Sequence, residues 1–157
     1  MNVIMGVDPT KVDDAAAFTL GMRGSPDGLT EYVYVEASAA VAQYAAALIS
    51  EDGTIAELTT TTAAGGTGSG KRVCVPQVAI AQDKFGWAAI YGNGGRVKVK
   101  GAANCVKFTQ LNTTATAGVL DDAATAAFVL GAVLEETLTG AAAADVSLNY
   151  PHVNITI

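Results

Sequence analysis

Turn-forming residues interrupt this 157-residue chain about every eight to twelve residues, and short β-branched segments lie between them. The clearest turns are the segment GSPDG at 24–28 and the pairs Asp52-Gly53 and Asn93-Gly94. Pro26 fixes φ in the first turn, and Gly28 permits a positive φ. Val and Ile outnumber Leu by more than two to one, which favours strands over helices. This pattern predicts an all-β protein, a small sandwich or barrel of short antiparallel strands.

The alternation of apolar and polar residues places the expected strands. Residues 16–38 are expected to form a strand, a turn and a second strand, and residues 47–58 a hairpin around Asp52-Gly53. Further strands are expected at 73–81, 85–92, 96–101, 104–111, 118–120, 126–137, 144–150 and in the C-terminal HVNITI. Gly131 is expected to mark a bulge or bend. The Ala-rich segment 39–44 allows at most a short helix.

We expect residues 1–14 to form an irregular N-terminal arm and residues 15–157 a single β-domain, with a flexible loop at 59–70. The alternation in EYVYVEA, residues 31–37, places Tyr32 and Tyr34 on one face of a strand and Val33 and Val35 on the other. Trp87 is expected to be largely buried. The predicted buried strand residues are Val97, Val99, Val129, Leu130, Val133 and Leu148.

The segment AAGGTGSGKRV, residues 63–73, contains most of a phosphate-binding P-loop. A P-loop requires a hydrophobic strand before it, a helix after it, and a hydroxyl residue after its lysine to bind magnesium. Here Arg72 follows Lys71, the preceding ELTTTTAA is polar, and the β-branched VCVPQVAIA follows with Pro76 inside it. We therefore interpret the segment as a connector between strands and expect no nucleotide binding.

The formal net charge of −6 is unfavourable for binding nucleic acid, which requires a basic surface. The segment MNVIMGVDPT lacks a basic region followed by a long apolar stretch, so we expect no signal peptide. No apolar stretch is long enough to cross a membrane as a helix, so we expect no membrane partner. Cys74 and Cys105 have neither a metal-binding spacing nor a disulfide pattern, and we expect both to be small core residues.

The sequence offers few candidate catalytic groups. His152 is the single histidine, and no nucleophile motif accompanies it. The carboxylates form adjacent pairs, and adjacent residues in a strand point in opposite directions. These pairs are Asp13-Asp14, Glu51-Asp52, Asp121-Asp122 and Glu135-Glu136. The segment DPTKVDD also lacks the spacing of a calcium-binding loop. We therefore expect no enzyme activity, no cofactor and no metal.

Two surfaces have a binding interpretation. The expected strand at 96–101 places three basic side chains on one face: Arg96, Lys98 and Lys100. They could form a strip that docks on an acidic surface. We favour the alternative, in which they form a solvated face or protect the edge of the sheet. The aromatic residues could form a platform for sugars. These are Tyr32, Tyr34, Tyr44, Trp87 and Tyr91. We favour a structural role, with Trp87 and Phe85 in the core and Tyr32 and Tyr34 on a wet sheet face.

Several segments between residues 16 and 153 resemble a known family. They are YVYVEASAAVAQYAAALISEDGTIAELT, FGWAAIYGNGGRVKVKG, TATAGVLDD, VLGAVLEE and SLNYPHV. They are similar to the Ala/Gly/Thr-rich head decoration, or cement, proteins of tailed bacteriophages. The resemblance implies a structural virion protein, made in the host cytoplasm, that binds the major capsid protein on the outside of the head. Related β-domains in tails and fibres leave a module that binds host glycans as the alternative.

The apolar segment MNVIMGVD at residues 1–8 is too short to form its own core. We therefore expect Val3, Ile4, Met5 and Val7 to contact the major capsid protein. The resemblance also implies a shell with three-fold positions, which favours a homotrimer.

Overall fold

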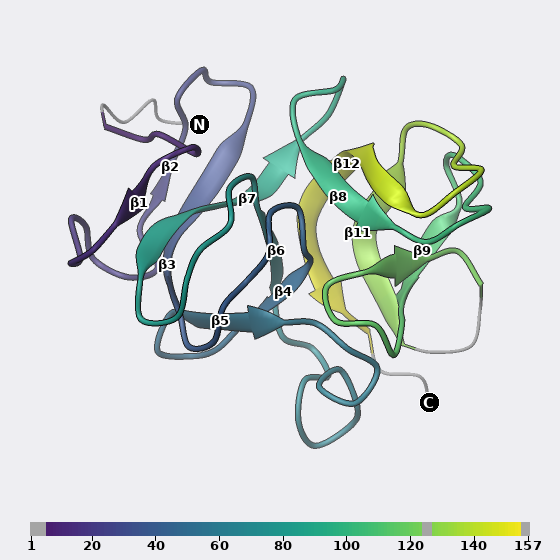
Figure 1. Ribbon diagram of the computed structural model, residues 1–157, viewed down its shortest axis with the longest axis horizontal. Coiled ribbons are helices and arrows are strands. Elements are labelled where there is room, and N and C mark those ends of the chain that lie inside the picture. The colour runs from purple at the N-terminus through teal and green to yellow at the C-terminus, as the bar shows by residue number, and fades with distance from the viewer. Residues whose placement is uncertain (1–5, 124–126, 155–157) are drawn as a thin grey trace.

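The computed structural model describes residues 6–123 and 127–154, in which it contains twelve strands and no helix (Figure 1). The first six strands are β1 (Val12–Asp13), β2 (Arg23–Gly24), β3 (Glu31–Ala37), β4 (Ala47–Ile49), β5 (Thr54–Glu57) and β6 (Val73–Pro76). The others are β7 (Phe85–Gly92), β8 (Lys98–Gly101), β9 (Gln110–Thr113), β10 (Leu120–Asp121), β11 (Phe128–Leu134) and β12 (Ala142–Val153). The all-β prediction is therefore confirmed. None of the described residues belongs to a helix long and apolar enough to cross a membrane.

The strands form two closed cycles of pairing that meet where β12 pairs with β7. In the first cycle, β3, β7, β6, β4 and β5 pair in that order, and the β3–β5 pairing closes the ring. In the second, β11, β9, β10, β8 and β12 pair in order, and the β11–β12 pairing closes it. Figure 1 shows the first ring at the centre and left and the second at the right. Closing a sheet in this way leaves few exposed edges.

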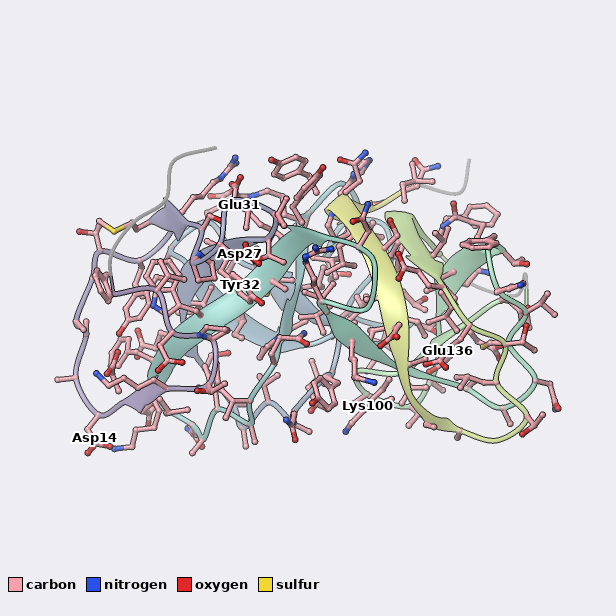
Figure 2. All side chains as sticks on the ribbon, turned by 90° about the horizontal axis from the view of Figure 1, so that it is seen from above. Asp14, Asp27, Glu31, Tyr32, Lys100 and Glu136 are labelled. Atoms are coloured by element: carbon pink, nitrogen blue, oxygen red, sulfur yellow. The ribbon has the colours of Figure 1, made fainter. Side chains whose placement is uncertain are left out.

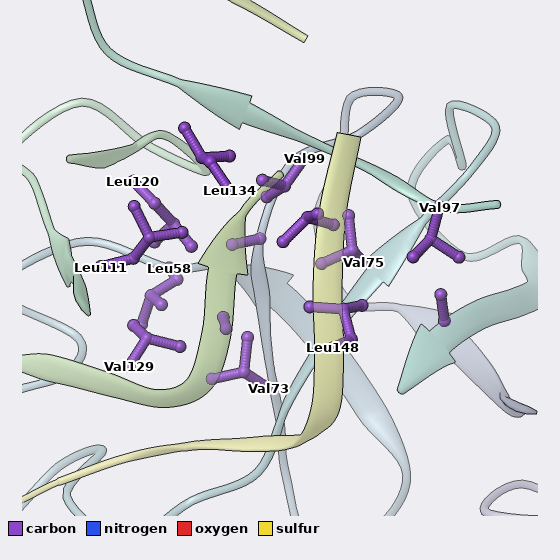
Figure 3. Close-up of a cluster of buried hydrophobic side chains, with 14 of the residues drawn as sticks. Leu58, Val73, Val75, Val97, Val99, Leu111, Leu120, Val129, Leu134 and Leu148 are labelled. Atoms are coloured by element: carbon purple, nitrogen blue, oxygen red, sulfur yellow. The ribbon is translucent and has the colours of Figure 1, made fainter. Parts of the chain in front are cut away.

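The first ring encloses a core of small and β-branched side chains. Val33, Val35, Ile55, Ala88 and Ile90 belong to this cluster. The second cluster is larger and extends from the second ring onto the outer face of the first. Figure 3 shows part of it on both sides of β12, with Leu58, Val73, Val75, Val97, Val99, Leu111, Leu120, Val129, Leu134 and Leu148 labelled.

The strand β3 is buried on both faces, which corrects the prediction that Tyr32 and Tyr34 line a wet sheet face. Tyr32 is 3% exposed and Tyr34 is 0% exposed. Ala17 and Phe18 fold over Tyr34, and the Phe18 ring lies 5.2 Å from the ring of Tyr34 and 5.1 Å from that of Trp87. Alternation correctly separates the two faces of β3, but both faces contact apolar cores.

The described part of the predicted N-terminal arm is packed on the domain. Residue Val12 pairs with Gly86 and Asp13 with Phe85, so β1 adds a strand beside β7. Val7 is buried in the larger apolar cluster. The segment expected to be an irregular arm therefore pairs with β7 through β1 and packs on the β-domain through Val7.

The possible short helix at 39–44 is absent. Val41 forms an isolated bridge with Ile80, and Tyr44 has a φ of 63°, outside the helical region. The backbone N–H of Tyr44 donates to Pro76 and its carbonyl accepts from Lys100, so neighbouring segments use the groups that a helix would pair internally. Long-range pairing thus overrides the helix preference of alanine.

The bulge predicted at Gly131 is present, and it corrects part of the predicted core. The register between β11 and β12 shifts between Leu130 and Ala132, and Gly131 has a φ of 80°. The shift exchanges the faces of β11, so Ala132 and Leu134 are buried. Val133 is therefore only half-buried instead of buried. Leu130, which precedes the shift, is also half-buried, because it lies on the face opposite the buried Val129. The predictions for Val97, Val99, Val129, Leu148 and Trp87 are confirmed, since all are at most 2% exposed.

Several strand boundaries also differ from the predictions. Of the strand, turn and strand expected over 16–38, the first strand is reduced to the two residues of β2, which pairs with β3 across the turn. The strand expected over 73–81 ends at Pro76, and the one expected over 104–111 begins only at Gln110. The predictions for β7 and for the β4–β5 hairpin are confirmed.

Candidate functional site

The P-loop-like segment forms a compact series of turns between β5 and β6. Thr59 and Thr62 exchange hydrogen bonds between backbone N–H and hydroxyl groups, at 2.8 and 3.1 Å. Gly70 N–H donates to Val153 O at 2.8 Å, which fixes the end of the segment to β12. The strand β6 begins two residues after Lys71, so this segment does not lead into the helix whose N–H groups a P-loop directs at phosphate.

The predicted basic strip has the expected alternation but does not lie at an edge. Val97 and Val99 are fully buried, whereas Lys98 and Lys100 are half-buried and Arg96 is exposed. The strand β8 pairs with β12 on one side and β10 on the other, so it is not an edge strand. Lys98 lies 3.1 Å from Asp145 on β12, and this ion pair raises the pKa of the lysine. The strip is therefore partly neutralised within the domain.

The aromatic side chains do not form one exposed platform. Trp87 is buried beside Tyr34, with their ring centres 5.1 Å apart, and Phe18 packs on both rings. Phe85, which was expected in the core, is only half-buried and packs against Tyr34. Tyr91 is half-buried, and it packs against Tyr150 at the opposite end of β7. A sugar cannot reach Trp87 in this arrangement.

The carboxylates are spread over the molecule and serve structural roles. Figure 2 shows Asp14, Asp27 and Glu136 far apart. Members of one pair have different partners: Glu135 accepts bonds from the N–H groups of Gly94 and Gly95, and Glu136 accepts one from Asp145 N–H. His152 is exposed, and its Nδ1 lies 3.4 Å from the Tyr150 carbonyl. Within the described chain, His152 therefore has no triad partner.

The predicted capsid-contact residues divide into two groups. Val3, Ile4 and Met5 lie outside the described residues. Val7 is 8% exposed and packs in the domain's own core, so its side chain is not free to contact a partner.

The connection from β8 to β9 carries exposed apolar side chains that sequence reasoning missed. Phe108 is 67% exposed and Val106 is 52% exposed, the largest such values beside Leu29 at 54%. The sequence predicts a strand over 104–111 with Cys105 in the core, and it gives no prediction for the burial of Val106 or Phe108. No signal in the sequence points to their exposure. This connection lies at the side of the molecule far from β1 (Figure 1).

Hydrogen bonds from three segments hold residues 105–108, which we call the 105–108 loop. Val106 N–H donates to the Asp122 carboxylate at 2.8 Å, and Phe108 N–H donates to Leu134 O at 2.8 Å. Cys105 O accepts a bond from Leu138 N–H at 2.9 Å. These bonds fix the loop to the connections that follow β10 and β11.

The buried thiol of Cys105 adds a further contact between the 105–108 loop and β10. The ligand atoms of Cys105, Asp121 and Asp122 lie within 4.8 Å of one another, but each already has a protein partner. The Cys105 thiol lies 3.5 Å from Asp121 Oδ1, and Asp122 accepts the bond from Val106. Burial raises the pKa of the thiol, so it stays protonated and can donate. The predictions that Cys74 and Cys105 are core residues are confirmed.

The backbone of the 105–108 loop is itself unusual. Phe108 has a φ of 59°, in the left-handed region that bulky residues rarely adopt. A left-handed conformation costs an L-residue roughly 1–2 kcal/mol. The hydrogen bonds of the 105–108 loop therefore hold the exposed Phe108 in an unfavourable backbone conformation, and the domain gains no core packing from its ring. Strain of this kind is typical of residues that serve a function.

Comparison with known proteins adds no functional assignment. No protein-family model matches the chain, and no curated protein is significantly similar to it.

Proposed function

We propose that this chain is a structural virion protein that binds the outside of a tailed-bacteriophage head and stabilises the shell. Two points support the proposal: the resemblance of its β-domain segments to head decoration proteins, and the exposed 105–108 loop. The loop is the main structural support for the proposal, because its hydrogen bonds hold Phe108 and Val106 exposed to solvent. A structural partner, which needs a contact and no chemistry, fits this surface.

The partner in this proposal is the major capsid protein. Fully burying a Val or Phe side chain contributes about 1.5–3 kcal/mol, so one loop provides only a few kcal/mol. Two side chains bury much less than the roughly 800 Å² per partner of a stable pairwise interface. A contact of this size suits an assembly in which many weak contacts act together on one shell.

We further propose that the protein occupies the shell as a homotrimer. Closed rotational symmetry is the usual arrangement of protein oligomers, and a shell offers three-fold positions where such a ring fits. Three copies would present three 105–108 loops to the shell. Their linkage would then increase the overall affinity through effective concentration. The proposal gives the chain no catalytic step, cofactor or metal, and it locates the protein on virions after synthesis in the host cytoplasm.

The alternative, a tail or fibre module that binds host glycans, has less support. That function was expected to use exposed aromatic residues such as Trp87 and Tyr91. Trp87 is 2% exposed and Tyr91 is half-buried, so no flat aromatic platform is open along β7.

Electron cryomicroscopy of decorated shells tests the proposal. Shells assembled from the major capsid protein of the same virus are incubated with the purified protein and imaged. We expect added density on the outer surface, arranged in threes, with the 105–108 loop against the shell. The absence of added density would contradict the proposed function. Density with monomers or two-fold pairs would contradict the trimer alone.

A further inference from the structure

A small pocket opens where four strands of the first ring and its neighbours meet, on a surface distinct from the 105–108 loop. Its volume is about 160 Å³. The lining residues are Arg23, Arg72, Val73, Ile90, Tyr150 and Pro151. They come from β2, β6 with the residue before it, β7 and β12. The pocket is therefore lined mainly by apolar residues, with two arginines among them.

Tyr150 is held at this pocket by a bulge in β12. Leu130 pairs with His152 and Ala132 pairs with Leu148, so β12 has extra residues opposite Gly131. Tyr150 lies in this bulge with a φ of 47°, and its side chain is 42% exposed. Bulges that redirect a side chain are frequent next to binding and active sites.

Three contacts fix the Tyr150 ring in place. Its hydroxyl donates to Glu31 Oε2 at 3.1 Å, and its ring centre lies 5.4 Å from that of Tyr91. The Arg23 guanidinium carbon lies 5.8 Å from the ring centre. Figure 2 shows Glu31 beside Asp27 and Tyr32 at this side of the molecule. The ring is thus a preformed wall and loses little freedom when a ligand binds.

The charges around the pocket leave one positive charge without a partner. Arg23 lies 3.6 Å from Glu31, which is itself mostly buried. Arg72 is exposed, and no carboxylate of the described chain lies within ion-pair distance of it. Arg23, Arg72 and Glu31 together carry a formal charge of +1 on a protein whose net charge is −6. A ligand with a single negative charge would neutralise the site.

We propose that this pocket binds a small ligand that carries one carboxylate on a flat or branched apolar body. The carboxylate would contact Arg72, whose planar guanidinium matches a carboxylate with two parallel hydrogen bonds. The apolar body would lie on Val73, Ile90 and Pro151, against the ring of Tyr150. The few polar groups and the small volume favour an aryl or branched-chain carboxylate over a sugar, whose hydroxyl groups would need more partners.

Titration with sodium benzoate, followed by two-dimensional ¹H–¹⁵N NMR of the full chain, tests this proposal. We expect saturable shifts with a millimolar Kd, largest at Val73, Ile90 and Tyr150. The substitution Arg72→Gln should weaken binding at least about tenfold, because it removes a charged hydrogen bond. Arg72→Lys should weaken it less, since the charge remains without the planar fork. Arg96→Gln, at an exposed arginine outside the pocket, is the matched control and should leave the Kd unchanged.

Uncharged benzamide and the acidic sugar glucuronate separate the chemical classes. Benzamide should bind at least about tenfold more weakly than benzoate, because it lacks the charge. Equal binding of benzamide and benzoate, an unchanged Kd in Arg72→Gln, or shifts that do not saturate would overturn the proposal. Tighter binding of glucuronate than of benzoate would assign the pocket to acidic sugars and would also overturn it. None of these results depends on capsid binding, so this proposal can fail while the proposed function stands.

Discussion

The hydroxyl group of Tyr34 joins the first strand to the centre of the domain, because it donates a hydrogen bond to Asp13 Oδ2 at 2.8 Å. The same hydroxyl accepts a bond from Ala17 N–H at 3.1 Å. Its ring is fully buried against Phe18 and Trp87. Residues 12–18 therefore cover the outer face of the first ring and belong to the folded domain.

The substitution Tyr34→Phe tests this connection. It keeps the ring packing and removes both hydrogen bonds, so the free energy of unfolding should fall by about 1–3 kcal/mol. Urea unfolding measures the change. Tyr91→Phe is the control, since the Tyr91 hydroxyl has no partner in the described part of the chain, and it should change stability by less than about 0.5 kcal/mol. If Tyr34→Phe is as stable as the wild type, the segment does not depend on this contact.

Leu111 lies in the core of the second ring, so truncating its side chain should lower the stability of the protein strongly. This side chain is fully buried, so Leu111→Ala should lower the free energy of unfolding by about 2–5 kcal/mol. Leu29→Ala makes the same chemical change at a side chain that is 54% exposed, and it should cost less than about 0.5 kcal/mol. Thermal and urea unfolding of the two variants compare them directly. Similar costs would show that the burial of Leu111 is wrong.

Gly131 is required by the bulge in β11. A Cβ atom at this position would lie 2.4 Å from Asn149 O, and the φ of 80° is unfavourable for any other residue. Gly131→Ala should therefore destabilise the protein by at least about 2 kcal/mol. A Cβ atom at Gly140 would meet nothing within 4 Å, so Gly140→Ala should be close to neutral. A stable Gly131→Ala variant would argue against the bulge.

The turn between β2 and β3 predicts a dependence of stability on pH. Desolvation alone would raise the pKa of Asp27, but bonds from Leu29 N–H, Thr30 N–H and the Thr30 hydroxyl outweigh it and lower the pKa below 3.8. A group with a lowered pKa stabilises the fold above its unfolded value and loses this contribution as the pH falls through the folded value. Asp27→Ala should therefore cost about 1 kcal/mol near neutral pH.

The difference in unfolding free energy between wild type and Asp27→Ala should shrink as the pH falls below 3.8. Urea unfolding at a series of pH values measures this. Asp14→Ala is the control, because its side chain is 92% exposed and its ion pair with Lys84 lies on the surface. A difference for Asp27→Ala that stays constant with pH would show that the carboxylate charge does not hold the turn.

Local patterns predicted the parts of the fold that depend on neighbouring residues. Alternation and turn chemistry were sufficient for β7, for the β4–β5 hairpin and for the buried Val97 and Val99. The bulge at Gly131 was also predictable, because a glycine inside an apolar strand marks such a site. Its effect on Val133 was not, since the shift in register changes which face points inward. Leu130 precedes the shift, and the prediction that it is buried together with its neighbour Val129 was wrong because adjacent strand residues point to opposite faces.

Other wrong predictions concern residues whose exposure or strand pairing depends on segments elsewhere in the sequence. Whether Tyr34 faces water depends on Ala17 and Phe18, which fold over it from another part of the chain. Residues 105–108 alternate as a strand would, but their N–H groups bond to Asp122, Thr137 and Leu134 instead of a ladder partner. The exposure of Phe108, on which the proposed function depends, therefore could not be read from the local pattern.

The occupancy of capsid shells by the variant Phe108→Gly tests the central proposal most directly. Glycine removes the exposed ring and accepts the φ of 59° without strain, so stability should stay within about 1 kcal/mol of the wild type. Co-sedimentation with shells of the same virus measures occupancy, with Leu29→Ala as an exposed-leucine control that should bind normally. We predict at least about a tenfold loss of affinity for Phe108→Gly, since the buried ring contributes about 1.5–3 kcal/mol. Equal occupancy by Phe108→Gly and the wild type would contradict a contact through the 105–108 loop, and failure of the wild-type protein to bind any shell would contradict its function as a decoration protein.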